Sequence, residues 1–399
     1  MTLARPGFKF AAAFVAVSLL LAACAPTRSD GIVPPGLAAA DAAFRDWMER
    51  HGAQEGSLAI GRDGRLVAAL GYGGREADDR VLVASLSKAI TAVCAGTLVD
   101  EGRLGFDTRL RDALAAHFAR NGAAADPRLA DVTIGQLLTH RAGFDRDTLP
   151  DPASGPLLQA HLRGHAPGDA SIDPLLAAGL ARTLPRAPGE RFAYTNVAYL
   201  ALGAAIEAAD GRPYADACAA RALAPLGLDA VTLDPDWAVL SSFAGWRLSA
   251  PEYLAFLRAF DDDSPVLGPQ ARAFLRDPQG KHVARGSYYA LGTFARATAD
   301  GGRNLWHSGR WHWRAGGVGD STSPADLGAY FVRLSSGEAF VATFAPVASG
   351  ADAVRDLDRT MIAALRAVKD WPEGDLFARY GIGPMTNRGS VVVPPRSAP

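Results

Sequence analysis

Residues 81–99 read Val81-Leu-Val-Ala-Ser85-Leu-Ser-Lys88-Ala-Ile-Thr-Ala-Val-Cys-Ala-Gly-Thr-Leu-Val99. The apolar residues after Lys88 recur with the three- and four-residue spacing of a helix, so Ser85 is predicted to lie where a helix begins. One helical turn places the side chains of Ser85 and Lys88 on the same face. The free N–H groups at a helix N-terminus add partial positive charge beside the serine oxygen.

This spacing suits nucleophilic catalysis. A serine hydroxyl is a weak nucleophile unless a base lies within hydrogen-bond reach, and a lysine becomes such a base when burial lowers its pKa. Arginine cannot lose its proton, and this arginine-rich chain has lysine only at positions 9, 88, 281 and 369. The competing interpretation is an N-cap serine followed by a lysine whose stem lies along the helix.

The first 23 residues are predicted to be a signal peptide. Arg5 and Lys9 form a basic stretch, and Phe10–Leu20 is apolar but short for a bilayer span. The following Leu-Ala-Ala-Cys24 resembles the processing box of bacterial lipoproteins, which implies cleavage before Cys24 and lipidation of its thiol. Because Ala25 is not Asp, the resemblance implies a periplasm-facing outer-membrane lipoprotein. The alternative is an ordinary secretory signal with an incidental cysteine.

The rest of the chain is predicted to form one large domain. We expect a tether at 24–36, the domain at 37–385 and a disordered tail at 386–399. Asp63-Gly64 lies between two apolar runs and predicts a β-hairpin. A mostly helical pattern follows, with a Thr133 cap, and a polar stretch at 145–173 is the best candidate for a loop over a site. Later strands are expected at 288–295, 304–314, 329–334 and 339–345, before a helix at 352–368.

Strands at both ends and helices between them indicate an α/β (α+β) fold. We expect an antiparallel sheet flanked by N- and C-terminal helices, built from about 37–84 and 285–370. An all-helical subdomain, about 85–284, would be inserted between the strands, with the Ser85 helix along the junction.

Other site classes have weak support in the sequence. The net charge is −1 and no basic stripe is present, so we expect no nucleic-acid partner. His161 and His165 have metal-ligand spacing but lack the glutamate of a zinc-protease helix. Export permits a disulfide between Cys94 and Cys218, yet their alanine-rich helical surroundings favour two buried thiols.

Two further motifs follow the serine–lysine pair in order, Tyr194-x-Asn196 and His307-x-Gly309. Taken alone, the first is common turn material and the second suggests a packed histidine. With the three motifs in this order, the chain resembles the class C β-lactamase and serine D,D-peptidase superfamily, which also includes esterases and D-aminopeptidases. The resemblance extends over nearly all of the mature chain and implies the β-lactamase/transpeptidase-like fold.

The resemblance implies a role for each motif. Ser85 would attack a carbonyl and form an acyl-enzyme, with Lys88 and Tyr194 sharing the proton transfer and no metal or organic cofactor. A tyrosine can act as a base only where nearby positive charge favours its phenolate.

The remaining motif residues are expected to bind the substrate. Asn196 would hydrogen-bond the substrate amide or the lysine. Gly309 would let an acyl chain lie against its strand, and the backbone N–H groups of Ser85 and Arg310 would hold the oxyanion.

Two departures from the superfamily bear on the substrate. His307 stands where class C β-lactamases have lysine, and a histidine is only partly charged near neutral pH, so its hold on a carboxylate should weaken as pH rises. Bulky residues, Arg310-Trp-His-Trp-Arg314, follow Gly309 where the superfamily has small ones. One interpretation is that they offer a basic or stacking contact to an acyl group. The other is ordinary strand alternation, with the arginines facing outward and the tryptophans packed inward.

We therefore predict a lipid-anchored serine hydrolase with D,D-peptidase or esterase-type activity on a small-molecule or peptide amide or ester. The alternatives are a class C-like β-lactamase and a non-catalytic envelope lipoprotein that binds peptidoglycan stems. The sequence does not determine the substrate or the oligomeric state.

Overall fold

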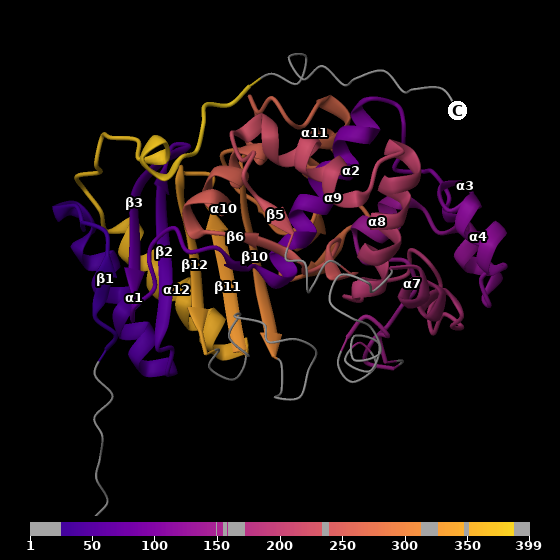
Figure 1. Cartoon of the computed structure of the whole chain (residues 1–399), viewed down its shortest axis with the longest axis horizontal. Coiled ribbons are helices and arrows are strands. Elements are labelled where there is room, and N and C mark those ends of the chain that lie inside the picture. Colours follow the sequence, from indigo (N-terminus) through magenta and orange to yellow (C-terminus); the bar gives the residue numbers. More distant parts are fainter. Residues whose placement is uncertain are drawn as a thin grey trace, which may run out of the picture.

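The computed structural model describes residues 25–148, 150–154, 158, 172–233, 239–312, 326–346 and 351–386. Within them, nine strands form one antiparallel sheet in the order β1-β3-β2-β12-β11-β10-β9-β8-β7 (Figure 1). The strands are β1 (Arg28–Asp30), β2 (Glu55–Arg62), β3 (Arg65–Tyr72), β7 (His282–Ala284), β8 (Ser287–Ala290), β9 (Thr293–Ala297), β10 (Arg303–His312), β11 (Asp326–Arg333) and β12 (Glu338–Ala345). The predicted signal peptide, Cys24 and the predicted tail from 387 onward lie outside the described residues.

The sheet joins the two ends of the domain. β2 and β3 meet at Asp63 and Gly64, whose φ angles of 49° and 74° match the turn that an Asp-Gly pair favours. β2 then pairs with β12, where Leu58 lies opposite Ala342. The predicted hairpin and the predicted sheet of distant segments are both confirmed.

Two terminal helices cover one face of this sheet. They are α1 (Ala38–His51) and α12 (Ala351–Arg366), which agree with the helices expected there (Figure 1). The Trp47 ring packs edge-on against Phe344 of β12, with 4.7 Å between the ring centroids. The indole N–H of Trp47 also donates to the carbonyl of Ala353, which ties both helices to the same face.

The opposite face carries the helical part of the chain, as predicted (Figure 1). Its helices are α2 (Ser87–Asp100), α3 (Leu110–Ala113), α4 (Ala115–Asn121), α5 (Ile134–Leu138), α7 (Ile172–Leu180), α8 (Asn196–Asp210), α9 (Tyr214–Cys218), α10 (Ala250–Phe256) and α11 (Pro269–Arg276). Thr133 caps α5 through a capping box with Gln136, which confirms the predicted cap. A small sheet of β4 (Val81–Leu82), β6 (Trp246–Leu248) and β5 (Thr232–Leu233) leads into the Ser85 turn.

Helix α2 lies at the centre of the molecule. Every residue from Ser87 to Val99 is buried, so the helix is enclosed on all sides rather than on one apolar stripe. None of the helices in the described ranges combines the length and apolar character needed to cross a bilayer.

Two boundary predictions are wrong. The predicted tether contributes β1, in which Arg28 lies opposite Tyr72, because the open edge of β3 offers backbone groups that local composition does not reveal. The single strand predicted at 288–295 is two strands, β8 and β9, which reverse at Leu291 and Gly292. A Cβ at Gly292 would lie 2.4 Å from the carbonyl oxygen of Lys88, so this turn packs directly on the start of α2.

The prediction of two buried thiols is also wrong. Cys94 of α2 and Cys218 of α9 form a disulfide, with their Cα atoms 5.2 Å apart. The bond closes a loop across a separation of 124 residues. In the chain-entropy view, removing a native disulfide costs about 2–5 kcal/mol. The bond therefore pins α2 to α9.

Candidate active site

Ser85 lies in a tight turn, η2 (Ala84–Leu86), between β4 and α2. The preceding residue, Ala84, has φ of 47°, a left-handed conformation that a residue with a Cβ rarely adopts. Ala84 and Leu86 are buried, whereas Ser85 is partly exposed. The turn thus presents one hydroxyl to a ligand while its neighbours anchor in the core, and such local strain is common at functional sites.

Lys88 is fully buried and lies against that hydroxyl, as predicted from the helical spacing. Its Nζ is 3.1 Å from Ser85 Oγ, 2.8 Å from Asn196 Oδ1 and 3.1 Å from the carbonyl oxygen of Phe243. The residues are brought together from three separate segments. The predicted serine–lysine pair is therefore present as a contact, not only as a pattern.

The surroundings of Lys88 favour its neutral form. Burial lowers the pKa of the ammonium well below its usual value; the Asp151 carboxylate opposes this and the Arg146 guanidinium adds to it. A neutral amine has two N–H donors and one lone pair. The carbonyl oxygens of Asn196 and Phe243 accept the two N–H groups, which leaves the lone pair for the Ser85 hydroxyl. This arrangement suits a general base.

Tyr194 lies beside Lys88, whose Nζ is 4.8 Å from the centroid of its ring, and burial raises the pKa of its phenol. The Ser85 hydroxyl and Arg146, whose guanidinium carbon lies 5.2 Å from the Tyr194 ring centroid, lower it by less. A tyrosine can act as a base only as its phenolate, and this raised pKa disfavours the phenolate of Tyr194. The phenol oxygen is buried, and apart from the nearby Ser85 hydroxyl no described residue offers it a hydrogen bond, so its proton is available to a ligand at Ser85.

Asn196 begins α8, and its side chain hydrogen-bonds Lys88 and other protein groups. Its Oδ1 accepts from Lys88, and its Nδ2 donates to the Ala153 carbonyl and to Ser154 Oγ, both at 3.0 Å. Of the two roles predicted for Asn196, the structure shows the contact with Lys88. Both amide hydrogens are already used within the protein.

Asp151 is a buried residue that sequence reasoning missed. Its carboxylate accepts from Thr195 Oγ1 at 2.7 Å, from the Asn196 N–H at 2.6 Å and from the Ala153 N–H at 2.9 Å. It therefore holds the turn that carries Tyr194 at the N-terminus of α8, where negative charge is favourable. The only signal was its place in the stretch predicted to lie over a site.

His140 is a second missed residue. It adopts φ of 53° at the end of α5 and is buried among aromatic rings, with its centroid 4.3 Å from that of Tyr194 and 4.8 Å from that of Tyr289. Burial lowers the pKa of its imidazole well below the usual value, with smaller contributions from Lys88 and other nearby positive groups. A neutral ring packed on Tyr194 fixes the plane of the phenol. No local pattern marked this histidine.

Gly309 brings β10 against the Ser85 turn. A Cβ at this position would lie 2.2 Å from the carbonyl oxygen of Val83 and 3.2 Å from the Ser85 nitrogen. β9 pairs with β10 only as far as Trp306, and no other strand in the described ranges lies beside the edge of β10 next to Ser85. Glycine is required for this close approach of two backbones, and the open edge is available to an extended ligand.

The first two residues after Gly309 follow the alternation expected from the sequence, with the arginine outward and the tryptophan inward. Arg310 is exposed, while Trp311 packs against the core on the helical side of the sheet. Trp313 and Arg314 lie outside the described residues. The oxyanion role predicted for the Arg310 N–H stays a prediction.

His307 is buried and neutral, so the predicted partial charge near neutral pH is wrong. Nδ1 donates to the Ser308 carbonyl at 2.7 Å, and Nε2 lies 3.1 Å from the Tyr289 hydroxyl, which donates to it in this tautomer. Burial lowers the pKa of His307 to about 3, with a further contribution from Lys88. The imidazole therefore positions neighbours and offers no charge to a carboxylate.

This neutrality predicts the pH dependence of activity. Between pH 5 and 8, where an ordinary histidine titrates, we expect no step in kcat/KM that belongs to His307. Profiles of the wild type and of His307→Gln should have the same shape even if their heights differ. A step near pH 6.5 that is present in the wild type and lost in His307→Gln would contradict this assignment.

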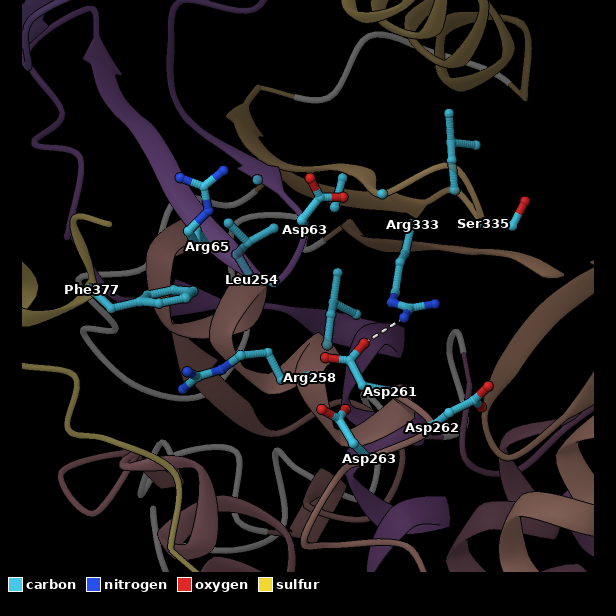
Figure 2. Close-up of a pocket in the computed structure, with 16 residues that line it drawn as sticks. Asp63, Arg65, Leu254, Arg258, Asp261, Asp262, Asp263, Arg333, Ser335 and Phe377 are labelled. Carbon is cyan, nitrogen blue, oxygen red and sulfur yellow. Dashed lines mark hydrogen bonds and ion pairs between the residues drawn. The ribbon is translucent and has the colours of Figure 1, made fainter. Parts of the chain in front are cut away.

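A separate cavity of about 400 Å³ opens where the β2–β3 and β11–β12 hairpins turn (Figure 2). Figure 2 shows Arg333 paired with Asp261 across it. Arg62 and Arg276, which lie outside its lining, pair with Asp63 and Asp262 of the wall. Ser85, Lys88 and Tyr194 are absent from its lining, so we do not assign the reaction to it.

No cluster of histidine, cysteine or acidic side chains within the described ranges has the arrangement of a metal site. His161 and His165, the weak candidates from the sequence, lie outside those ranges.

Comparison with known proteins agrees with this geometry. The family model described as Beta-lactamase matches residues 40–388. Penicillin-binding protein 4 of Amycolatopsis lactamdurans is 33% identical over 145 residues, which is 36% of this chain and 33% of that protein. The matched part thus spans about a third of the length of the curated relative.

Solved structures share the fold at low identity. A D-stereospecific amidohydrolase from Streptomyces sp. superposes with a TM-score of 0.63 at 20% identity, covering 84% of this chain and 99% of that one. A class C β-lactamase from Rhodobacter sphaeroides gives a TM-score of 0.60 at 17% identity, covering 82% and 99%. The predicted β-lactamase/transpeptidase-like fold is confirmed. Since the family model spans most of its length, the chain belongs to the β-lactamase family.

Proposed function

We propose that the chain is a serine hydrolase that cleaves an amide or ester through an acyl-enzyme on Ser85. The supporting observation is the fully buried Lys88 amine, held 3.1 Å from Ser85 Oγ with its pKa lowered by burial. Lys88 takes the hydroxyl proton as Ser85 Oγ bonds to the carbonyl carbon. The backbone N–H groups of Ser85 and Arg310 would stabilise the resulting oxyanion.

The second proton transfer is assigned to Tyr194. Because its phenol stays protonated, it donates that proton to the leaving nitrogen or oxygen as the carbonyl bond to that atom breaks. The proton held by Lys88 then returns to the tyrosine oxygen. Water attacks the acyl-enzyme by the reverse path, which releases the acid and restores Ser85.

Within the family we favour D,D-peptidase or esterase-type activity over an efficient β-lactamase. His307 is neutral and its two ring nitrogens are engaged by Ser308 and Tyr289, so it gives a substrate carboxylate no charged partner. We also infer export and a lipid anchor at Cys24; the Cys94–Cys218 disulfide supports an oxidising compartment.

Intact-protein mass spectrometry tests this proposal. The mature soluble form, without its anchor, is incubated with a fluorophosphonate or a penicillin. We expect one fluorophosphonate adduct on Ser85, absent from Ser85→Ala and retained by the neighbouring Ser87→Ala. A persistent penicillin adduct would favour the peptidase, fast penicillin turnover the β-lactamase, and a fluorophosphonate adduct alone the esterase. No adduct with either reagent would contradict the enzyme and favour a binding lipoprotein.

A further inference from the structure

A second cavity, of about 830 Å³, extends away from the catalytic centre along β10. It lies on the α12 side of the sheet, where Trp306, Ser308 and Arg310 alternate toward it. Its apolar wall is formed by aromatic and branched side chains from β9, β11, β12 and α12, namely Phe294, Val332, Phe344, Val354 and Ile362. The cavity could therefore enclose an apolar segment of a ligand.

The charge of this cavity is unbalanced. Five arginines line it, Arg146, Arg285, Arg296, Arg310 and Arg355. Among the described lining residues Asp358 is the one carboxylate. It accepts from the Tyr330 hydroxyl at 2.8 Å, and burial raises its pKa.

Most of these arginines are not neutralised by the protein. Arg355 forms an ion pair with Asp352. The other four form no ion pair within the described part of the chain, although the charge of Arg296 lowers the pKa of Asp358, and Arg146 stacks over Tyr194 and Arg296 over Trp306. The other cavity, by contrast, has four aspartates beside its three arginines, and Arg333 pairs with Asp261 there. Like charges gathered beside an apolar wall repel one another, and a bound anion would relieve that repulsion.

The cavity comes close to the Ser85 turn at the edge of β10, although Ser85, Lys88 and Tyr194 are not part of its lining. Gly309 is part of its lining and also the residue that contacts the Ser85 turn, with a Cβ there 3.2 Å from the Ser85 nitrogen. Arg146 borders the cavity while lying over the ring of Tyr194. A ligand extending from Ser85 past the open edge of β10 would therefore meet the apolar wall and the unpaired guanidinium groups.

We propose that this cavity binds the acyl part of the substrate, and that this acyl part is an apolar segment ending in an anionic group, a carboxylate or a phosphate. The inference rests on the proposed hydrolase function and adds its substrate class. Guanidinium groups bind both kinds of anion through paired N–H donors, so arginine rather than lysine is the suitable lining residue.

Matched esters test the preference. The mature chain is given p-nitrophenyl esters of adipic acid with the far carboxyl either free or methylated, and a third ester with a phosphonate at that end. We expect kcat/KM to favour the anionic esters over the neutral one by about tenfold at low ionic strength, and this preference to shrink as salt is added. The carboxylate and phosphonate arms show which anion fits better.

Variants assign the preference to the cavity. In the double variant Arg296→Gln/Arg310→Gln, the ratio of kcat/KM for anionic over neutral ester should fall about fivefold or more. Arg366→Gln removes an equal charge from an exposed position at the end of α12, outside the cavity lining, and should keep the wild-type ratio. A wild-type ratio of one or less, or an unchanged ratio in the double variant, would overturn the proposal.

A binding measurement separates this inference from the hydrolase itself. The fluorescent anion anilinonaphthalene sulfonate, which has an apolar body and one charge, is titrated into Ser85→Ala protein. Affinity should fall when the two cavity arginines are replaced in that background and persist with Arg366→Gln. If the arginine replacements weaken binding but the wild type hydrolyses none of the esters, the anion site is supported and the proposed hydrolase activity is rejected. Equal binding by all three proteins would reject the site.

Discussion

Replacing Lys88 by arginine should abolish acylation while preserving the fold, with kcat/KM falling by at least about a thousandfold. As the proposed base, Lys88 would act in its neutral form, which is favoured because burial lowers the pKa of its amine and two carbonyl oxygens take its N–H groups. Arginine keeps its proton at every accessible pH, so no lone pair would face Ser85 Oγ. Stopped-flow release of p-nitrophenol measures the acylation step directly.

The pH profile of kcat/KM tests whether Lys88 must be deprotonated. Activity requires deprotonated Lys88, so kcat/KM should rise with pH through the pKa of this group and level off above it. Since that pKa is lowered by burial, the rise should lie well below the ordinary lysine value of about 10.4.

Lys88→Met serves as a second variant, because it removes the amine without placing a fixed charge in the core. Both variants should remain folded by circular dichroism and be inactive. Acylation retained by Lys88→Arg would exclude Lys88 as the base, whatever the Met variant does.

Gly309→Ala should lower kcat/KM by about a hundredfold or more and destabilise the protein by about 1–3 kcal/mol. The added methyl group would lie 2.2 Å from the Val83 carbonyl oxygen and 3.1 Å from Leu86 Cδ1, on either side of the nucleophile. Both neighbours are fixed, one as backbone and one as a buried side chain. The Ser85 turn or β10 must therefore move, and the reacting atoms move with it.

A matched glycine controls for the change in backbone freedom. At Gly374 an added Cβ would meet no atom within 4 Å, so Gly374→Ala should leave stability within about 0.5 kcal/mol and activity unchanged. Urea unfolding gives the stability, and initial rates on a neutral ester give the activity. If Gly309→Ala behaved like Gly374→Ala, the close packing of β10 on the Ser85 turn could not be what positions the nucleophile.

Short sequence patterns correctly predicted the features that depend only on neighbouring residues along the chain. The serine–lysine contact follows from one turn of helix, the β2–β3 hairpin from an Asp-Gly pair, and the start of α5 from the Thr133 cap. Helices at the two ends of the domain were also expected, and α1 and α12 lie there. The order of three short motifs gave a resemblance to a known superfamily, and that resemblance predicted the fold.

The missed features all depend on contacts between distant segments. β1 is a strand only because the edge of β3 is open, and Cys94 meets Cys218 only because α2 packs beside α9. His140 and Asp151 have no motif of their own, and their roles appear once the turn bearing Tyr194 is folded against them.

The sequence by itself determined which residues could react, because nucleophile and base are three positions apart on one helix. Only the tertiary structure decided their protonation. Segments 108 and 155 residues away bury Lys88 and accept its N–H groups, which lowers its pKa, and similar burial favours the uncharged forms of His307 and Tyr194. Helical spacing is a local property of the backbone, whereas the loss of solvent that shifts a pKa requires the whole packed core.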